Sequence, residues 1–294
     1  FMVDIKFSSY PFDVPTEKRM VNKFDKLIAE LKECGSARTA ALAIKHWNKY
    51  VEELTTQISV IYVLYTCNTT NIAYKKAQQR CDELSPIISN YSNQFQKILT
   101  KARYRKELEK IYGKYLFKMY DDALKAFDEK IMGDLVEENK LVSKYDEIFG
   151  TAQIPFRGEV LNTSQLGKHL QAKDKAERKE AAVALDKWIG EHDKEIGDIY
   201  SQLVTLRDGM AKKLGFKTFV ELGYLRLGRS DYNAKKVKDY RQQIEEDVVT
   251  VCQKLYKQQI KLLGIKNPQY YDYNLRYPTG NAKPAGDEKY LVKA

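Results

Sequence analysis

Two heptad patterns separated by a short polar segment place the strongest limit on what this chain can fold into. In each pattern apolar residues recur at alternating steps of three and four, the spacing that lines one side of a helix. The first comprises Ile44, Trp47, Val51, Leu54, Ile58, Ile61 and Tyr65, and the second comprises Ala77, Cys81, Leu84, Ile88, Tyr91, Phe95 and Ile98. Residues 68–71, Asn-Thr-Thr-Asn, favour a turn between them. The sequence therefore predicts two helices, each roughly 30 Å long at about 1.5 Å per residue, folded back as an antiparallel hairpin.

The rest of the first half also has helical spacing. One helix is expected to begin near Thr16, and two more are expected at about 105–130 and 134–148, with Gly150 ending the last of them. Pro86 lies inside the second arm of the hairpin. A proline there removes a helical hydrogen bond, so we expect either a kink or a helix that restarts with Ser85 as its cap.

The second half begins with a change of character. Residues 151–163 hold a proline and a glycine in a short apolar stretch, which predicts a strand or a hairpin. Asp174 and Glu177 have the spacing of a helix start; a further helix is expected over 196–214 and a long one over 237–262, followed by an extended segment. We therefore predict a mostly α fold in two domains: a long-helix hairpin domain, residues 1–149, and a helical domain with a short β segment, residues 150–294.

Composition excludes several classes of protein. Hydrophobic residues make up 43% of the 294 and charged residues 31%, so the chain can bury a core and is not wholly disordered. Four cysteines without a CxxC pair argue against a disulfide scaffold or a cysteine zinc finger and fit a reducing compartment. No apolar stretch has the length of a signal peptide core or a bilayer crossing, so a cytoplasmic protein is expected. A helix expected from Asp287 stops short at Ala294, and we expect the chain to be a fragment.

Searches for catalytic motifs are mostly negative. None of the three histidines, His46, His169 and His192, belongs to an HExxH zinc motif. The segment 223–230 approaches a phosphate-binding loop, but it has Arg229 where that loop needs lysine and no strand pattern before it. Neighbouring carboxylates such as Glu137 and Glu138 point about 100° apart on a helix, so they do not form an acid–base pair. The sequence thus offers no catalytic and no metal-binding residue.

The net charge of +10 leaves an anionic partner open. Basic residues concentrate between Lys97 and Lys118, with few acidic residues among them. Such a run is typical of a solvated helix face. The alternative is a basic helical scaffold that binds nucleic acid or another anionic partner, which predicts binding that weakens steeply with salt.

One stretch is more specific than any of these patterns. Within residues 199–251 the chain reads LVTLRDGMAKKLGF and then ELGYLRLGRSDY, and this block resembles the oligoendopeptidase F family of zinc metallopeptidases, relatives of thimet oligopeptidase. The flanking segments IPFRGEVLNTSQLGKHL and YYDYNLRYPTGNAKPAG are similar to that family as well. The chain departs from the family at Thr250, where a proline usually follows two valines, and we expect a more regular helix there.

The resemblance implies a cytoplasmic peptidase that cleaves short peptides in a channel between two lobes. Residues 150–294 would then be the first part of the catalytic domain. The zinc ligands, the general base and the groups that stabilise the oxyanion would all lie in a C-terminal catalytic half, so this chain alone is expected to bind no zinc and to be inactive.

The resemblance leaves this chain the role of contacting the substrate. Tyr224, Arg226, Arg229 and Tyr232 lie close together in sequence near an expected bend. An arginine can pair with a peptide carboxylate and a tyrosine can donate to the peptide backbone, so these four and Tyr271 are the candidate substrate-binding residues. The alternative is structural: the four residues brace a junction of helices, with Asp231 paired to one of the arginines, and the tyrosines near 271 pack an extended segment.

Overall fold

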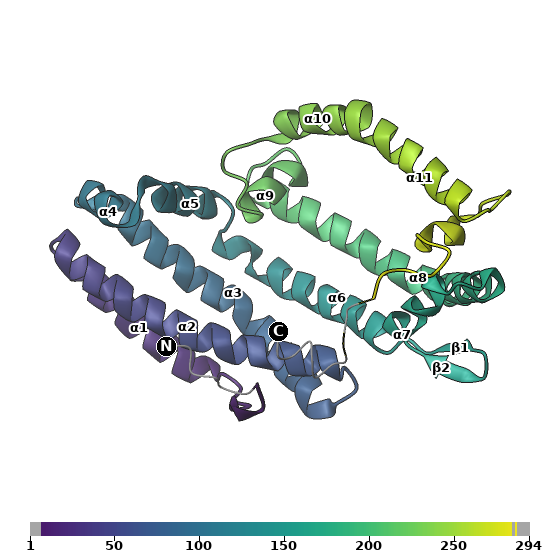
Figure 1. Ribbon diagram of the computed structural model, residues 1–294. Helices are drawn as coiled ribbons and strands as arrows, with labels where there is room; N and C mark the ends of the chain where they lie inside the picture. Colours follow the sequence, from purple (N-terminus) through teal and green to yellow (C-terminus); the bar gives the residue numbers. More distant parts are fainter. Residues whose placement is uncertain (1–6, 284–285, 287–294) are drawn as a thin grey trace. The chain divides into compact units, whose positions relative to one another are not determined.

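The computed structural model describes residues 7–283 and 286, and its contacts divide the chain into two units. Unit 1 comprises residues 1–151 and 196–235, and unit 2 comprises residues 152–195 and 236–294. The helix expected from Asp287 lies outside the described residues. Apart from one two-stranded sheet, the regular structure of the described chain is helical, as expected (Figure 1). The division into domains 1–149 and 150–294 stays a prediction.

Unit 1 is built on the predicted hairpin. Helices α2 (Ala37–Cys67) and α3 (Ile72–Lys101) pack against each other and against α1 (Glu17–Lys32) (Figure 1). Ser36 caps α2 by accepting from the N–H of Thr39, and the side chain of Asn71 caps α3. Thr16 precedes α1 at the expected position, but its side chain makes no capping hydrogen bond.

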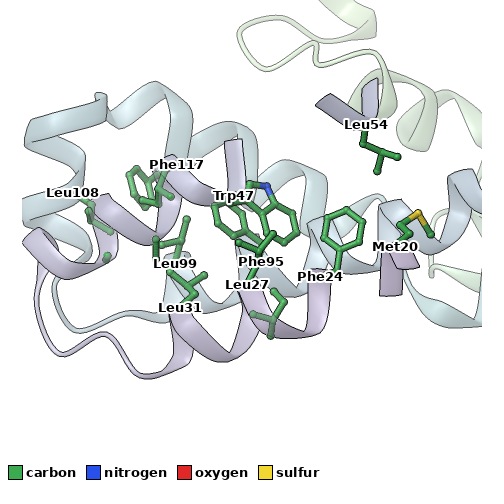
Figure 2. Close-up of a cluster of buried hydrophobic side chains, with 14 of the residues drawn as sticks. Met20, Phe24, Leu27, Leu31, Trp47, Leu54, Phe95, Leu99, Leu108 and Phe117 are labelled. Carbon is green, nitrogen blue, oxygen red and sulfur yellow. The ribbon is translucent and has the colours of Figure 1, made fainter. Parts of the chain in front are cut away.

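The core of this hairpin is aromatic. Trp47 of α2 stacks on Phe95 of α3 with 4.2 Å between ring centroids, and Phe24 of α1 packs against Trp47 at 5.1 Å (Figure 2). All three side chains are at most 5% exposed, and the apolar residues around them share that burial. Aromatic rings dominate core energetics because each buries a large apolar area. The heptad seams therefore lie inside unit 1, as predicted.

Helix α3 is not interrupted at Pro86. The expected restart with Ser85 as cap is wrong, because α3 passes through the proline as one helix. The expectation of one helix over 105–130 is also wrong. The chain forms α4 (Arg105–Tyr112) and α5 (Lys114–Lys125), because Gly113 between them takes a φ of 87°, which is incompatible with helix.

A short 3-10 turn, η2 (Glu129–Ile131), leads from α5 into α6 (Met132–Gly150), which ends at the predicted glycine. The start of α6 lies two residues before the expected one. Helix α6 packs on α3 and closes one side of the hairpin.

Unit 2 begins with the predicted hairpin of two short strands. Strands β1 (Ile154–Phe156) and β2 (Glu159–Leu161) pair antiparallel, with Ile154 opposite Leu161. Arg157 and Gly158 form the turn with φ values of 50° and 85°, the left-handed pair that a two-residue hairpin turn requires. Helix α7 (Thr163–Gly167) and the 3-10 turn η3 (His169–Gln171) follow.

Helix α8 (Lys175–Lys213) spans 39 residues, and the boundary between the two units falls inside it. The expectation of two separate helices here is wrong, since no residue between the two apolar stretches breaks the helix. Asp174 caps it as predicted, accepting from the N–H groups of Ala176 and Glu177. The helix ends ahead of Gly215, whose φ of 87° stops it.

The remaining helices are α9 (Phe219–Arg226), α10 (Ala234–Gln243) and α11 (Thr250–Leu262), with a π-helical turn, η4 (Ile244–Val249), joining the last two. The regular helix expected around Thr250 is therefore wrong, because an irregularity precedes it without a proline. The segment expected to be extended instead begins with the 3-10 turn η5 (Tyr270–Asn274). In the described part of the chain, no helix is long and apolar enough to cross a membrane.

Candidate functional site

The candidate site of unit 1 has a buried carboxylate at its centre. Glu138 of α6 is only 4% exposed. Arg207 of α8 donates from Nε to Oε1 of Glu138 at 2.6 Å. Arg226, the last residue of α9, donates from Nη1 and Nη2 to the two carboxylate oxygens at 3.2 and 2.7 Å. One side chain thus joins three helices through charge-assisted hydrogen bonds, the strongest kind that proteins form.

The two arginines also set the charge state of Glu138. Burial by itself would raise the pKa of Glu138, but the hydrogen bonds and positive charges of Arg226 and Arg207 outweigh it, and the pKa lies below its ordinary value. Both guanidinium groups lie near the ring of Phe219, at 5.8 and 6.0 Å from its centroid. The carboxylate therefore stays ionised and holds both arginines in place.

Arg229 has a different environment from Arg226. Its guanidinium lies 4.8 Å from the ring centroid of Tyr224 and 6.0 Å from that of Tyr232, and the two rings meet edge to face at 6.3 Å. Among the described residues Arg229 forms no ion pair. Aromatic faces orient a guanidinium without using up its hydrogen-bond donors. Arg229 can therefore still bind a carboxylate or a carbonyl oxygen.

The loop that carries Arg229 is fixed to α5. Lys118 donates from Nζ to the carbonyl oxygen of Ser230 at 2.8 Å, and the hydroxyl groups of Ser230 and Tyr115 lie 3.2 Å apart. With Arg226 bonded to Glu138 at one end and Ser230 held at the other, residues 227–229 form a short bridge with two anchors. The cluster of Tyr224, Arg229 and Tyr232 is thereby positioned before any ligand arrives.

The structure thus brings together three of the four candidate residues predicted near this bend. Tyr224, Arg229 and Tyr232 contact one another, whereas Arg226 turns to Glu138 and braces α9 against α6, as the structural alternative proposed. Its partner is Glu138 and not the expected Asp231. Sequence reasoning missed Glu138 and Arg207 because they lie 88 and 19 positions from Arg226, and no local spacing connects them. A role in substrate binding for any of the four stays a prediction.

Tyr271, the fifth candidate, lies in unit 2 and is only 7% exposed. Its ring packs edge to face on Tyr270, with 5.3 Å between centroids. A groove of about 1050 Å³ in the described part of unit 2 is lined by eight residues between Ser164 and Glu177 and by residues 279–283, and Tyr271 is not among them. Tyr271 therefore acts as a packing residue within its own unit, and its contact with substrate stays a prediction.

Next to Tyr271, unit 2 contains its own buried ion pair. Arg178 is 1% exposed and donates to Asp272, which is 0% exposed, at 2.8 Å, and also to the carbonyl oxygens of Ala172 and Lys173. Burial would raise the pKa of Asp272, but the backbone N–H of Gln269 and the cations of Arg178 and Lys175 lower it below its ordinary value. This pair joins the start of α8 to η5.

Among the described residues no metal centre is evident, and part of the basic run is paired with carboxylates. No group of three or more His, Cys, Asp or Glu residues in the described chain is arranged to hold a metal ion. In the basic run from Lys97 to Lys118, Arg105 pairs with Glu109 and Asp121, and Lys118 pairs with Asp122. These pairs reduce the charge that the run offers to nucleic acid.

Comparison with known proteins identifies the fold. Residues 7–127 match the model of the peptidase M3 N-terminal domain. The fold and nearly the whole length agree with a structure described as oligoendopeptidase F and with PZ peptidase A solved with an inhibitor, each with a TM-score of 0.95 and 34% sequence identity over 98% of this chain. The chain matches the N-terminal half of oligoendopeptidase F. A third structure, described as an oligoendopeptidase F from Bacillus anthracis, has 35% identity and a TM-score of 0.93.

The similarity to oligoendopeptidase F covers nearly all of this chain but only part of the solved relatives. The chain spans about half of those solved chains, between 51% and 53% of their residues. No curated protein matches it. The similarity to these peptidases therefore extends over nearly all of this chain, whereas the activity of a whole protein is a separate question.

Proposed function

We propose that residues 1–294 form the N-terminal half of a zinc-dependent oligopeptidase and supply part of its substrate channel. The observation that supports this most directly is the agreement with oligoendopeptidase F over 98% of the chain, and PZ peptidase A adds a relative that binds an inhibitor. The substrates would be short peptides, and a C-terminal catalytic half would be the partner that carries out the hydrolysis. A cytoplasmic location stays a prediction.

This chain would bind substrate and would not supply the chemistry. The donor groups of the described residues do not fit a zinc site, so no step of hydrolysis is assigned to them. Zinc held by another half of the protein would polarise the scissile carbonyl and activate water. Arg229, oriented by Tyr224 and Tyr232, would bind a carboxylate or a backbone carbonyl of the peptide.

The test compares the complete gene product with residues 1–294 expressed alone. The complete protein should hydrolyse short fluorogenic peptides, lose that activity with a chelator and regain it with zinc. Residues 1–294 alone should contain no stoichiometric zinc by elemental analysis and should cleave no peptide. A complete protein that is inert toward such peptides, or stoichiometric zinc with hydrolysis in residues 1–294, would overturn the proposal.

A further inference from the structure

The helix formed by α10, η4 and α11 has no buried side chain in the described structure. It runs without a break from Ala234 to Leu262, roughly 40 Å at about 1.5 Å per residue. By contrast, α2 and α3 bury apolar side chains along their whole length. A helix in a globular protein owes most of its stability to a packed apolar face. This one therefore lacks its main packing surface.

The apolar side chains of this helix form a stripe. Its members are Tyr240, Val248, Val251, Leu255 and Leu262, which are between 44% and 61% exposed. They follow one another at steps of 8, 3, 4 and 7 residues, the spacing that keeps side chains on one side of a helix. We call these five residues the α10–α11 stripe. Contiguous exposed apolar surface of this kind marks a site where other protein packs.

The existing contacts of the helix lie near its C-terminal end. Tyr256 packs edge to face on Tyr273 of η5 at 5.5 Å. Gln259 donates from Nε2 to the carbonyl oxygens of Tyr273 and Leu275 at 3.0 and 2.7 Å. At about 100° per residue, Tyr256 lies well away from the centre of the stripe, whereas Gln259 lies beside it, between Leu255 and Leu262. Unit 2 thus holds the helix through these two residues, and the five apolar side chains of the stripe stay exposed.

The length of the solved relatives points to what covers the stripe. They carry roughly as many residues again as this chain aligns with. We propose that the α10–α11 stripe is the surface against which a C-terminal half of the same polypeptide packs an apolar face. This inference rests on the proposed function for its partner, but it concerns assembly and not hydrolysis.

The π-helical turn supports a packing role over a freely solvated one. A π turn is rare inside an α-helix and is found frequently at functional sites. Here it lies in the middle of the helix, and Thr250 donates its hydroxyl to the carbonyl oxygen of Glu246 at 3.0 Å beside it. Val248 of the stripe belongs to this turn, so the turn sets the direction of a side chain that the partner would cover.

The experiment measures amide hydrogen exchange in the complete gene product. Peptides from residues 245–262 should exchange at least 10-fold more slowly than expected for an exposed helix. Leu255→Asp places a charge in the stripe and should remove that protection. The matched control is Gln253→Asp, which adds the same carboxylate to the same helix on another side and should leave the protection within about 2-fold. Far-UV circular dichroism verifies that both variants remain helical.

Each other outcome overturns the proposal. Fast exchange over 245–262 in the wild-type protein means that nothing covers the stripe. Protection that grows with concentration, together with a dimer mass by light scattering, assigns the stripe to a second copy of the chain. A gene product with no polypeptide beyond these 294 residues removes the partner. Peptidase activity is measured in parallel, so an inactive but protected protein refutes the proposed function alone, and an active but unprotected one refutes this inference alone.

Discussion

At the scale of single residues, the two arginines that flank residues 227 and 228 differ in what they can still bind. Arg226 gives two hydrogen bonds to the buried carboxylate of Glu138, so its planar fork is already occupied. Arg229 lies against two tyrosine rings and keeps its donors. Substitution of each should therefore change a different property of the protein.

We expect Arg229→Ala to raise KM for peptide substrates of the complete protein about 10-fold or more, because a hydrogen bond to a charged group is worth about 1.5–3 kcal/mol. The free energy of unfolding should change by less than about 0.5 kcal/mol. Arg226→Ala should instead lower the free energy of unfolding and have the smaller effect on KM. Steady-state kinetics and urea unfolding of both variants decide the matter. Equal effects of the two on stability, with KM unchanged in Arg229→Ala, would contradict a binding role for Arg229.

Glu138 should make stability depend on pH in the acid range. Its pKa in the folded protein lies below the ordinary 4.5, so between the two values the unfolded state binds more protons and stability rises with pH. Wild type should be more stable than Glu138→Gln by about 2 kcal/mol near pH 7, and this difference should shrink as the pH falls through the folded pKa. Urea unfolding from pH 3 to 7 measures it.

The control for this prediction is the neighbouring residue. The side chain of Glu137 is 54% exposed, and its Oε2 lies 4.0 Å from Nζ of Lys140, so this ion pair is weak. Glu137→Gln should therefore change the unfolding free energy by less than about 0.5 kcal/mol at every pH. A pH-independent difference between wild type and Glu138→Gln would show that the carboxylate charge does not contribute.

At the scale of helices and strands, the sequence predicts features that depend on neighbouring residues and misses contacts between residues far apart in the chain. Heptad spacing located α2 and α3 because burial on one side of a helix is written in the local pattern. The break at Gly113 was missed because a glycine inside a helical pattern is usually tolerated, and only its φ of 87° reveals the turn. The network around Glu138 was missed for a different reason. Its members come from three helices that are far apart in sequence, so no local pattern connects them.

Pro86 gives a case where one helix depends on another. It has no N–H, so the carbonyl oxygen of Asp82, four residues earlier in α3, has no helical donor there. Asn139 of α6 donates to that oxygen from Nδ2 at 3.2 Å. Asn139→Ala should therefore cost about 1–3 kcal/mol of unfolding free energy, the usual penalty for leaving a buried acceptor unpaired.

A double-mutant cycle with Pro86→Ala isolates this hydrogen bond. Alanine restores the N–H that the carbonyl of Asp82 lacks, so Asn139→Ala should cost at least about 1 kcal/mol less in the Pro86→Ala background than in wild type. Denaturant unfolding of the four proteins gives the coupling energy. Additive effects would mean that Asn139 stabilises α6 by some means other than this carbonyl.

At the scale of the whole molecule, each unit has its own buried ion pair, which joins segments that are far apart in sequence. Glu138 binds two arginines in unit 1, and Asp272 binds Arg178 in unit 2. A contact map derived from sequence spacing could not have assigned residues 196–235 to the same unit as residues 1–151, because α8 is one continuous helix that contributes to both. The two ion pairs allow the units to be perturbed one at a time.

We expect Asp272→Asn to destabilise unit 2 by about 3 kcal/mol, because it leaves the guanidinium of Arg178, which is 1% exposed, without its counter-charge. Amide exchange should then speed up over residues 154–178 and 268–281. The core of α2 and α3 belongs to unit 1 and should keep its protection. Asp193→Asn, at an exposed position of α8, is the control and should change neither. Faster exchange in both units by the same factor would show instead that they unfold as one cooperative body, because a loss confined to unit 2 would then be impossible.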